Sequence, residues 1–170
     1  MATSLFLGLV AGCGPDDAPQ PVEPERCSAP LTRGDGGAPG GIASRAITVG
    51  AGDGATFTPW VDGATTPVVM GFQGGAMITP TIRLPALPSD GASLCLRVEL
   101  RNTLSDASDV FPGVVADITF VRVGEVFEAA NLFDQLGFDA GSLRGKTLML
   151  VVEVTGMTFA GTTAISVLLQ

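Results

Sequence analysis

The stretch SLCLRVELR, residues 93–101, decides the fold of this chain. Its apolar residues Leu94, Leu96, Val98 and Leu100 alternate with polar or small ones. Successive side chains of a β-strand point to opposite faces, so this period of two predicts a strand with one face in a core and the other in water.

Segments on both sides of this stretch carry related signals. Residues 117–123 alternate in the same way, whereas 146–154 and 163–169 are almost continuously apolar. Such runs are typical of central strands buried on both faces. Residues 155–161 contain turn residues and are expected to close these two strands as a hairpin. Only residues 125–138 show helical spacing, which predicts one short helix, or a strand followed by a helical turn.

Towards the N-terminus, short apolar runs are separated by turn residues. They lie at 46–49, 56–61, 67–72 and 76–84, and Asp62-Gly63 predicts a tight hairpin. About eight short strands without repeating helices are the pattern of an all-β sandwich. We therefore predict that 46–170 form a single antiparallel β-sandwich with an immunoglobulin-like or related Greek-key path. The residues expected to be buried are Leu94, Leu96, Val98, Leu100, Leu148, Leu150, Val152, Ile165, Val167 and Leu169.

Composition excludes several functional classes. The 170 residues include no histidine and one lysine, Lys146, so Ser-His-Asp sites and His-ligated metals are excluded. The net charge is −8 without a Lys/Arg cluster, which argues against nucleic acid as a partner. The motif G-x-G-x-x-A at 50–55 precedes β-branched residues and Pro59, not a helix, so we interpret it as a turn and expect no cofactor.

The first thirteen residues have the pattern of a targeting signal. A short apolar run ends in Val10-Ala11-Gly12-Cys13, which resembles the lipobox of bacterial lipoproteins. The resemblance implies lipidation of Cys13, cleavage before it, and a palmitate-bearing protein anchored in a membrane. Such a signal peptide requires a Lys or Arg near its start, and none precedes Cys13. We therefore predict that translation starts upstream of Met1. Gly14, where inner-membrane lipoproteins carry Asp, favours the outer membrane, on its periplasmic or cell-surface side.

Three regions follow from these signals. Residues 1–12 are the signal peptide, 13–45 the lipidated cysteine and a Pro/Gly-rich linker expected to be disordered, and 46–170 the β-sandwich domain. Cys27 and Cys95 remain once Cys13 is lipidated. Export would place them in an oxidising compartment, where they either form a disulfide that pins the linker to the sheet or stay free thiols.

Acidic residues supply the remaining candidate site. Asp106, Asp109 and Asp117 lie in and beside a predicted loop, and Asp134 and Asp139 follow further along. Carboxylate oxygens bind calcium, and two close carboxylates hydrolyse glycosides. No complete calcium-loop spacing is present, so we interpret these acids as solvated loop carboxylates and assign no metal. Exposed aromatic candidates for a sugar site are Trp60 and Phe111.

A second resemblance covers about a quarter of the chain. Phe57-x-Pro59-x-x-Asp62-Gly63, the turn Gly71-x-Gln73-Gly74-Gly75 and the strand ending in Arg83 are similar to segments of uncharacterised bacterial lipoproteins. This implies a lipid-anchored β-sandwich without a known activity. Ala76-Met77 replace the aromatic-His pair that usually follows the two glycines.

The sequence thus favours a non-enzymatic, lipid-anchored protein of the cell envelope. Its β-sandwich would bind an envelope protein or a glycan, or act as a spacer. The alternative is a small calcium-dependent or carboxylate-based glycan hydrolase, or a glycan-binding module.

Overall fold

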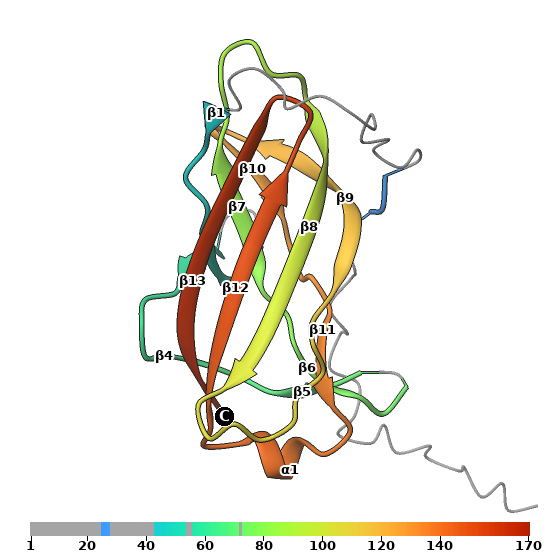
Figure 1. The fold of residues 1–170 in the computed structure, drawn as a ribbon. Coiled ribbons are helices and arrows are strands. Elements are labelled where there is room, and N and C mark those ends of the chain that lie inside the picture. Colours follow the sequence, from blue (N-terminus) through green and yellow to red (C-terminus); the bar gives the residue numbers. More distant parts are fainter. Residues whose placement is uncertain (1–24, 28–42, 54–55, 72) are drawn as a thin grey trace, which may run out of the picture.

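The structure is a computed structural model that describes residues 25–27, 43–53, 56–71 and 73–170. The predicted signal peptide, Cys13 and most of the predicted linker lie outside these residues. In the described part, strands far outweigh the single short helix α1 (Ala140–Leu143), which confirms the predicted all-β fold class (Figure 1). None of its helices is long and apolar enough to cross a membrane.

Ten strands form one large sheet in the order β1-β13-β12-β8-β9-β10-β7-β2-β3, and β4 also pairs with β13. Their bounds are β1 Ala43–Ser44, β2 Thr48–Ala51, β3 Thr58–Pro59, β4 Ala64–Thr66, β7 Thr81–Pro85, β8 Ser93–Leu104, β9 Val115–Val123, β10 Val126–Ala129, β12 Thr147–Thr155 and β13 Phe159–Leu169. A three-stranded sheet has the order β11-β6-β5. It consists of β5 Val69–Met70, β6 Ala76–Ile78 and β11 Asp134–Gly137, and α1 Ala140–Leu143 follows it.

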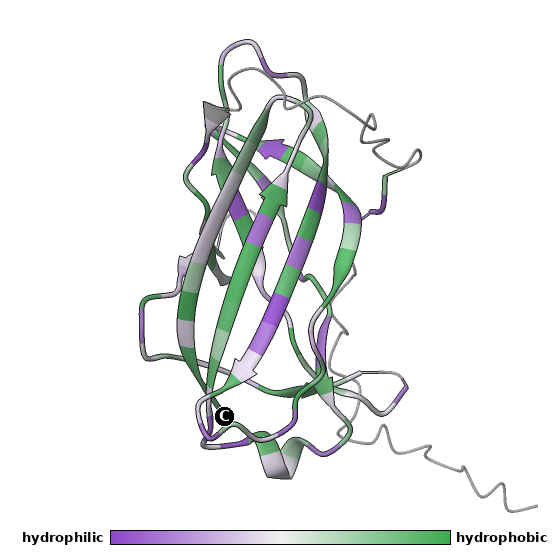
Figure 2. Cartoon of the chain, viewed as in Figure 1, coloured by the Kyte–Doolittle hydropathy of each residue, from purple (hydrophilic) through white to green (hydrophobic). Residues whose placement is uncertain are grey.

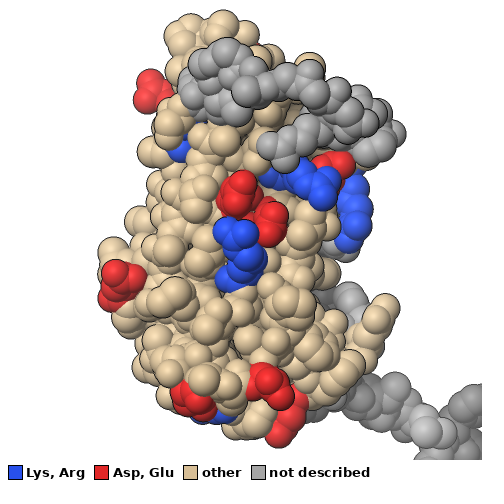
Figure 3. All heavy atoms as spheres, in the orientation of Figure 1, with Lys and Arg blue, Asp and Glu red and all other residues tan. Residues whose placement is uncertain are grey.

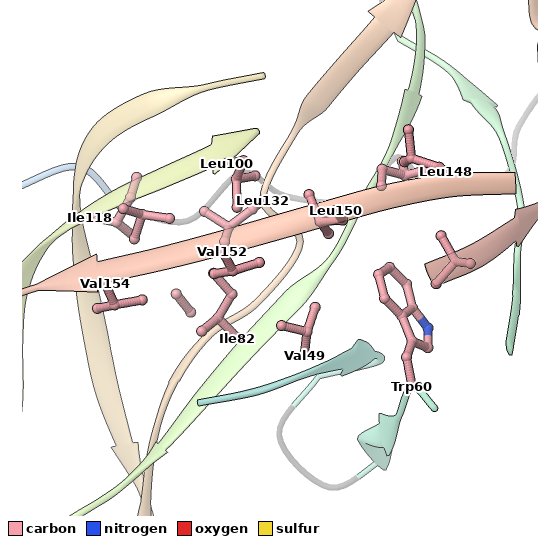
Figure 4. Packing of buried hydrophobic residues seen from close by; sticks show 14 of the residues in the cluster. Val49, Trp60, Ile82, Leu100, Ile118, Leu132, Leu148, Leu150, Val152 and Val154 are labelled. Carbon is pink, nitrogen blue, oxygen red and sulfur yellow. The ribbon is translucent and has the colours of Figure 1, made fainter. Parts of the chain in front are cut away.

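The large sheet curls into two layers. In Figure 1, β13, β12, β8 and β9 form the front layer, and β10, β7 and β2 lie behind it. Leu150 and Val152 on β12 face the same interior as Ile82 on β7 and Val49 on β2, and all four are buried (Figure 4). The two layers pack face to face around one apolar core, which is the arrangement of a sandwich.

Strand order reveals a Greek key. β8, β9 and β10 follow one another as antiparallel neighbours, and β12 returns to pair with β8. The spatial order β12-β8-β9-β10 is the order that defines the motif. The expected hairpin of β12 and β13 is also present, closed by a hydrogen bond from Gly156 N to Phe159 O of 2.9 Å.

The sheet is mixed, and not wholly antiparallel as predicted. β1 and β4 both pair parallel to β13. β1 lies at the end of the predicted linker and β4 in the N-terminal part of the predicted domain, and both lie along the outer edge of the C-terminal hairpin. Alternation along a strand shows which face is buried but not which partner the strand finds or in which direction, so the sequence could not reveal this pairing.

The predicted core is largely correct, but the prediction that β12 and β13 are buried on both faces is wrong. Leu94 and Ile165 are partly buried, and the other eight predicted residues are fully buried. Met149 on β12 is 50% exposed on the outer face. Hydrophilic and hydrophobic bands alternate along β8 in Figure 2, as its sequence predicts. Met149 is thus one of the exposed apolar side chains on this outer face, and isolated apolar side chains are common on protein surfaces.

Of the two alternatives predicted for 125–138, the short helix is wrong, and the strand is present but is not followed by a helical turn within the segment. This segment forms β10 and β11, and the short helix α1 follows it. β10 obtains its backbone hydrogen bonds from β7 on one side and β9 on the other. Leu132, Asp134 and Leu136 are buried alternately, which is a period of two that the helical spacing of the neighbouring residues obscured.

The expected turn at Asp62-Gly63 forms, but it does not close a hairpin. Ala64 N donates to Val61 O at 2.8 Å, and Gly63 has a φ of 80°. β3 before the turn pairs with β2, whereas β4 after it pairs with β13. The turn therefore carries the chain from the back layer to the edge of the front layer.

Candidate functional site

Two exposed aromatic rings mark the end of the sandwich that carries α1. Phe111 lies in the loop between β8 and β9, and Phe138 lies between β11 and α1. The ring centroids are 5.3 Å apart and the planes meet at 85°, an edge-to-face contact. Phe138 is 70% exposed and Phe111 is 37% exposed. We call these two residues the aromatic pair.

A buried polar pair holds the loop that carries Phe111. Nδ2 of Asn102, on β8, donates to Oδ1 of Asp134 at 3.0 Å and to the carbonyl oxygen of Phe111 at 3.3 Å. Phe111 N in turn donates to Leu136 O at 3.0 Å. The backbone of Phe111 is thereby fixed to both β8 and β11, so its ring stands on a rigid support.

Asp134 is fully buried, and burial raises its pKa to about 6, against the opposing effect of the Asn102 hydrogen bond. Two acceptor atoms of the pair, Oδ2 of Asp134 and Oδ1 of Asn102, are buried without a hydrogen-bond partner among the described residues. The interpretation of Asp134 as a solvated loop carboxylate is therefore wrong. Leu132 and Leu136, which lie two residues before and after Asp134, were the sequence signal of its burial.

The three calcium candidates do not converge. Oδ2 of Asp106 lies 3.0 Å from Lys146 Nζ, and its other oxygen accepts from Ser108, which holds the pKa of this carboxyl well below its usual range. Asp117 lies on β9 opposite Arg97 of β8 at 3.6 Å, and Asp109 is exposed in the loop. Across the described segments, no group of three or more His, Cys, Asp or Glu side chains is placed to hold a metal ion.

Trp60 is only 8% exposed and packs in the core (Figure 4), so it offers no platform for a sugar ring. The second aromatic of the exposed end is Phe138, which sequence reasoning did not single out because it is the last residue of the segment 125–138 that was predicted to be helical. Asp139, next to it, is bound locally, since its Oδ1 accepts from Gly141 N at 2.9 Å and caps α1.

Cys27 and Cys95 are bonded in a disulfide with a Cα–Cα distance of 5.7 Å. The short segment 25–27 lies along β9, where Thr119 N donates to Glu25 O at 2.9 Å and Cys27 N donates to Asp117 O at 3.1 Å. The bond links this segment to the outward face of β8, at the place where the sequence predicted a crossing linker.

The segments whose sequence is similar to uncharacterised bacterial lipoproteins have structural roles in the described part of the chain. The turn Gly71–Gly75 joins β5 to β6 and is closed by a 2.8 Å bond from Gly71 N to Gly75 O. The Arg83 guanidinium lies 4.1 Å from the centroid of the Phe57 ring, and its Nε lies 2.6 Å from Glu128. The glycine-rich loop after β2 leads into antiparallel β3, which agrees with its interpretation as a turn.

The front face of the sandwich is sparsely charged (Figure 3). On the strands that form it, Arg101 of β8 lies 3.2 Å from Glu99 and 3.6 Å from Glu153 of β12. All three side chains are at least one third exposed to solvent, so these contacts contribute little to stability.

Comparison with known proteins gives little further information. No protein-family model matches the chain, and no solved structure matches it. One curated protein, D-amino acid dehydrogenase 2 of Pseudomonas aeruginosa, is 30% identical over 102 residues, which are 60% of this chain and 22% of that protein. The chain thus matches about a fifth of the relative's length.

Proposed function

We propose that this protein is a lipid-anchored, non-enzymatic component of the bacterial cell envelope, located at the outer membrane, whose β-sandwich binds a partner or acts as a spacer. The observation that carries the proposal is the Cys27–Cys95 disulfide. Disulfides persist in exported proteins and are rare in the cytosol, so the bond supports export. Lipidation at Cys13 is the step that the lipobox resemblance adds.

The test of this proposal is metabolic labelling of the full chain with radioactive palmitate in a bacterial host. We expect label on the wild type, none on Cys13→Ala, and a shift to the unprocessed form on treatment with globomycin. Cys27→Ser is the matched control, because it removes another cysteine and should retain the label. A Cys13→Ala chain that is labelled and fractionates like the wild type would disprove the lipid anchor.

Glycan binding is the second candidate function, and the aromatic pair is the observation that favours it. Exposed aromatic rings offer an apolar face to a sugar, and Asp109 lies exposed in the same loop as Phe111. A carboxylate hydrolase is less well supported. The ion pair of Asp106 with Lys146 and its lowered pKa keep that carboxyl ionised, which is the wrong state for a general acid.

Calorimetric titration with soluble peptidoglycan fragments tests this second function. We expect Phe138→Ser to weaken binding about tenfold or more, the loss expected for an interaction of about 1.4 kcal/mol. Met157→Ser is the control, since Met157 is 83% exposed on the β12–β13 turn, away from the aromatic pair. Equal heats for the wild type and Phe138→Ser would exclude the aromatic pair as the glycan site.

The dehydrogenase match does not extend the proposal. It covers 22% of that protein, and a match this short does not carry a whole enzyme's activity to the present chain.

A further inference from the structure

The outer edge of β13 is covered at both ends and open in between. β1 pairs with Phe159 and Ala160 at one end, and β4 pairs with Val167, Leu168 and Leu169 at the other (Figure 1). Between them, Ser166 is bound by the turn at Asp62-Gly63, because Gly63 N donates to Ser166 O at 2.8 Å and Ser166 N donates to Asp62 Oδ1 at 3.0 Å.

The backbone groups of Thr162 and Ala164 point out of this opening. Ala160 O accepts from Arg45 N at 3.4 Å, so the even-numbered residues of β13 direct their N–H and C=O groups away from β12. Within the described part of the chain, no backbone hydrogen bond reaches Thr162 or Ala164 on that side. An unpaired strand edge of this kind is a template for another strand.

A hollow of about 90 Å³ lies directly inside the opening. β13 contributes Thr163 and Ile165 to its wall, and Ile47, Thr48, Val49 and Trp60 form the opposite wall. The lining is uncharged and mostly apolar. An apolar cavity of roughly 150 Å³ accepts benzene, so this smaller hollow matches the size of a branched aliphatic side chain.

The shape of the opening excludes edge-to-edge pairing with β13 of a second copy of this chain. It extends from Thr162 to Ile165, roughly 13 Å at 3.3 Å per residue. Gly161 at its upper end lies against Arg45 O and Ile47, and the Asp62 turn closes its lower end. The β13 edge of another copy would carry its own β1 and β4, which would collide with these flanks. Only a single narrow segment can enter.

The side chains around the opening define the chemistry of that segment. Thr48, Thr162 and Ala164 are exposed and uncharged, whereas Asp62 is an exposed acid at the lower end. With a net charge of −8 the chain repels acidic partners. The occupant is therefore free of acids and gains from a basic residue beside Asp62.

We infer that the edge of β13 between Thr162 and Ile165 binds an extended peptide segment of a partner protein, which adds as a strand and places one valine or isoleucine side chain in the hollow beside Trp60. Backbone hydrogen bonds to Thr162 and Ala164 supply affinity, and the hollow supplies selectivity, as in other strand-addition complexes. The site lies apart from the aromatic pair, and its occupation does not require lipidation.

Fluorescence polarisation of labelled peptides with the purified full chain tests this inference. The probe is the fluorescein-labelled peptide KTTITTS. Two comparison peptides are KTTDTTS, with an acid in place of isoleucine, and KTTITTS with N-methylated backbone amides. We expect saturable binding of the probe below about 1 mM and at least tenfold weaker binding of both comparison peptides. Binding should also change the emission of Trp60, the sole tryptophan.

Ala164→Pro removes the outward N–H without breaking a hydrogen bond to β12, and we expect it to weaken probe binding at least about tenfold. Ala164→Val keeps the N–H and is the matched control. If Ala164→Pro fails to fold, amide exchange in the wild type decides, because the probe should slow exchange at Thr162 and Ala164. The inference is overturned by absence of saturable binding, by binding that survives N-methylation or Ala164→Pro, or by exchange protection confined to other strands.

Discussion

The carboxyl group of Asp134 shows how a single residue can support an exposed site from within. It lies fully buried and accepts a hydrogen bond from Asn102, which also holds the carbonyl of Phe111. Burial of an acid is costly unless its oxygens are satisfied, and Oδ2 has no partner among the described residues. Stability is therefore lost at this position whenever the group is ionised.

The pKa of Asp134 predicts a falling stability between acid and neutral pH. Its folded value of about 6 lies above the ordinary 3.8, so the folded chain binds more protons in this window. Stability should decrease as the pH rises from about 4 to 6, by roughly 2–3 kcal/mol for this group. Asp134→Asn keeps an acceptor for Asn102 and cannot ionise. Urea unfolding of both proteins at several pH values should show this slope in the wild type, absent in Asp134→Asn.

The other acids also titrate, so the difference between the two proteins is the relevant quantity. The lowered pKa of Asp106 produces a slope of the opposite sign, which is common to both proteins and cancels. Identical pH profiles for wild type and Asp134→Asn would contradict a raised pKa.

Gly113 allows a close approach that no other residue permits. Its φ is 103°, and a Cβ at this position would overlap the carbonyl oxygen of Leu100. The loop is held close to Leu100 by a hydrogen bond of 2.7 Å from Leu100 N to Val114 O. We expect Gly113→Ala to cost more than about 2 kcal/mol of unfolding free energy, through strain and steric overlap. Gly124→Ala is the matched control, since Gly124 has a φ of 62° with open space around it, and should cost about 1 kcal/mol. Chemical denaturation measures both, and equal losses would rule out the steric term.

Long strands with clear alternation were predictable from the sequence, whereas short strands and pairings between distant segments were not. β8 and the β12–β13 hairpin follow from alternation and turn residues. β10 and β11 were obscured because strands this short carry too few residues to establish a period, and their hydrogen bonds come from β9, β7 and β6. Tertiary pairing outweighed a weak local helical pattern.

The candidate site was predictable only in part. Phe111 and the acids of its loop were singled out, whereas Asn102 and Phe138 were not. Asn102 lies two residues beyond Leu100 on the inward face of β8, so extending the alternation by one step would have placed it in the core. No feature of the sequence brings Phe138 next to Phe111, because that contact depends on the path of β11.

The disulfide is expected to stabilise the large sheet by restricting the unfolded chain. Cys27 and Cys95 are 68 residues apart, and closing a loop of that length is worth about 4 kcal/mol in the chain-entropy model. The double variant Cys27→Ser, Cys95→Ser should unfold at lower temperature in calorimetry. Dithiothreitol should lower the wild-type transition by a similar amount and leave the double variant unchanged. A wild type insensitive to reduction would contradict this contribution.

At the scale of the whole molecule, one core joins both layers of the curled sheet. Buried residues from β2, β7, β8, β9, β10, β12 and β13 belong to the same apolar cluster. Such a core is expected to unfold in a single cooperative step. Trp60, in this cluster, reports on the seam between the layers, while far-ultraviolet circular dichroism reports on all strands. The two urea transitions should coincide, and separate midpoints would show that the layers unfold independently.

The position of β13 in the chain also has a consequence for the order in which the protein can be assembled. β1 and β4 can pair only after β13 has been synthesised, which happens more than ninety residues after β4. β12, the other partner of β13, is also synthesised before it. Contacts this distant in sequence slow folding, because the intervening chain must be ordered before they form. A nascent chain emerging from the ribosome therefore cannot complete the sandwich, and it stays unfolded enough to pass through a narrow channel until β13 has been synthesised. A secretion channel that accepts only unfolded polypeptide would find the chain still open.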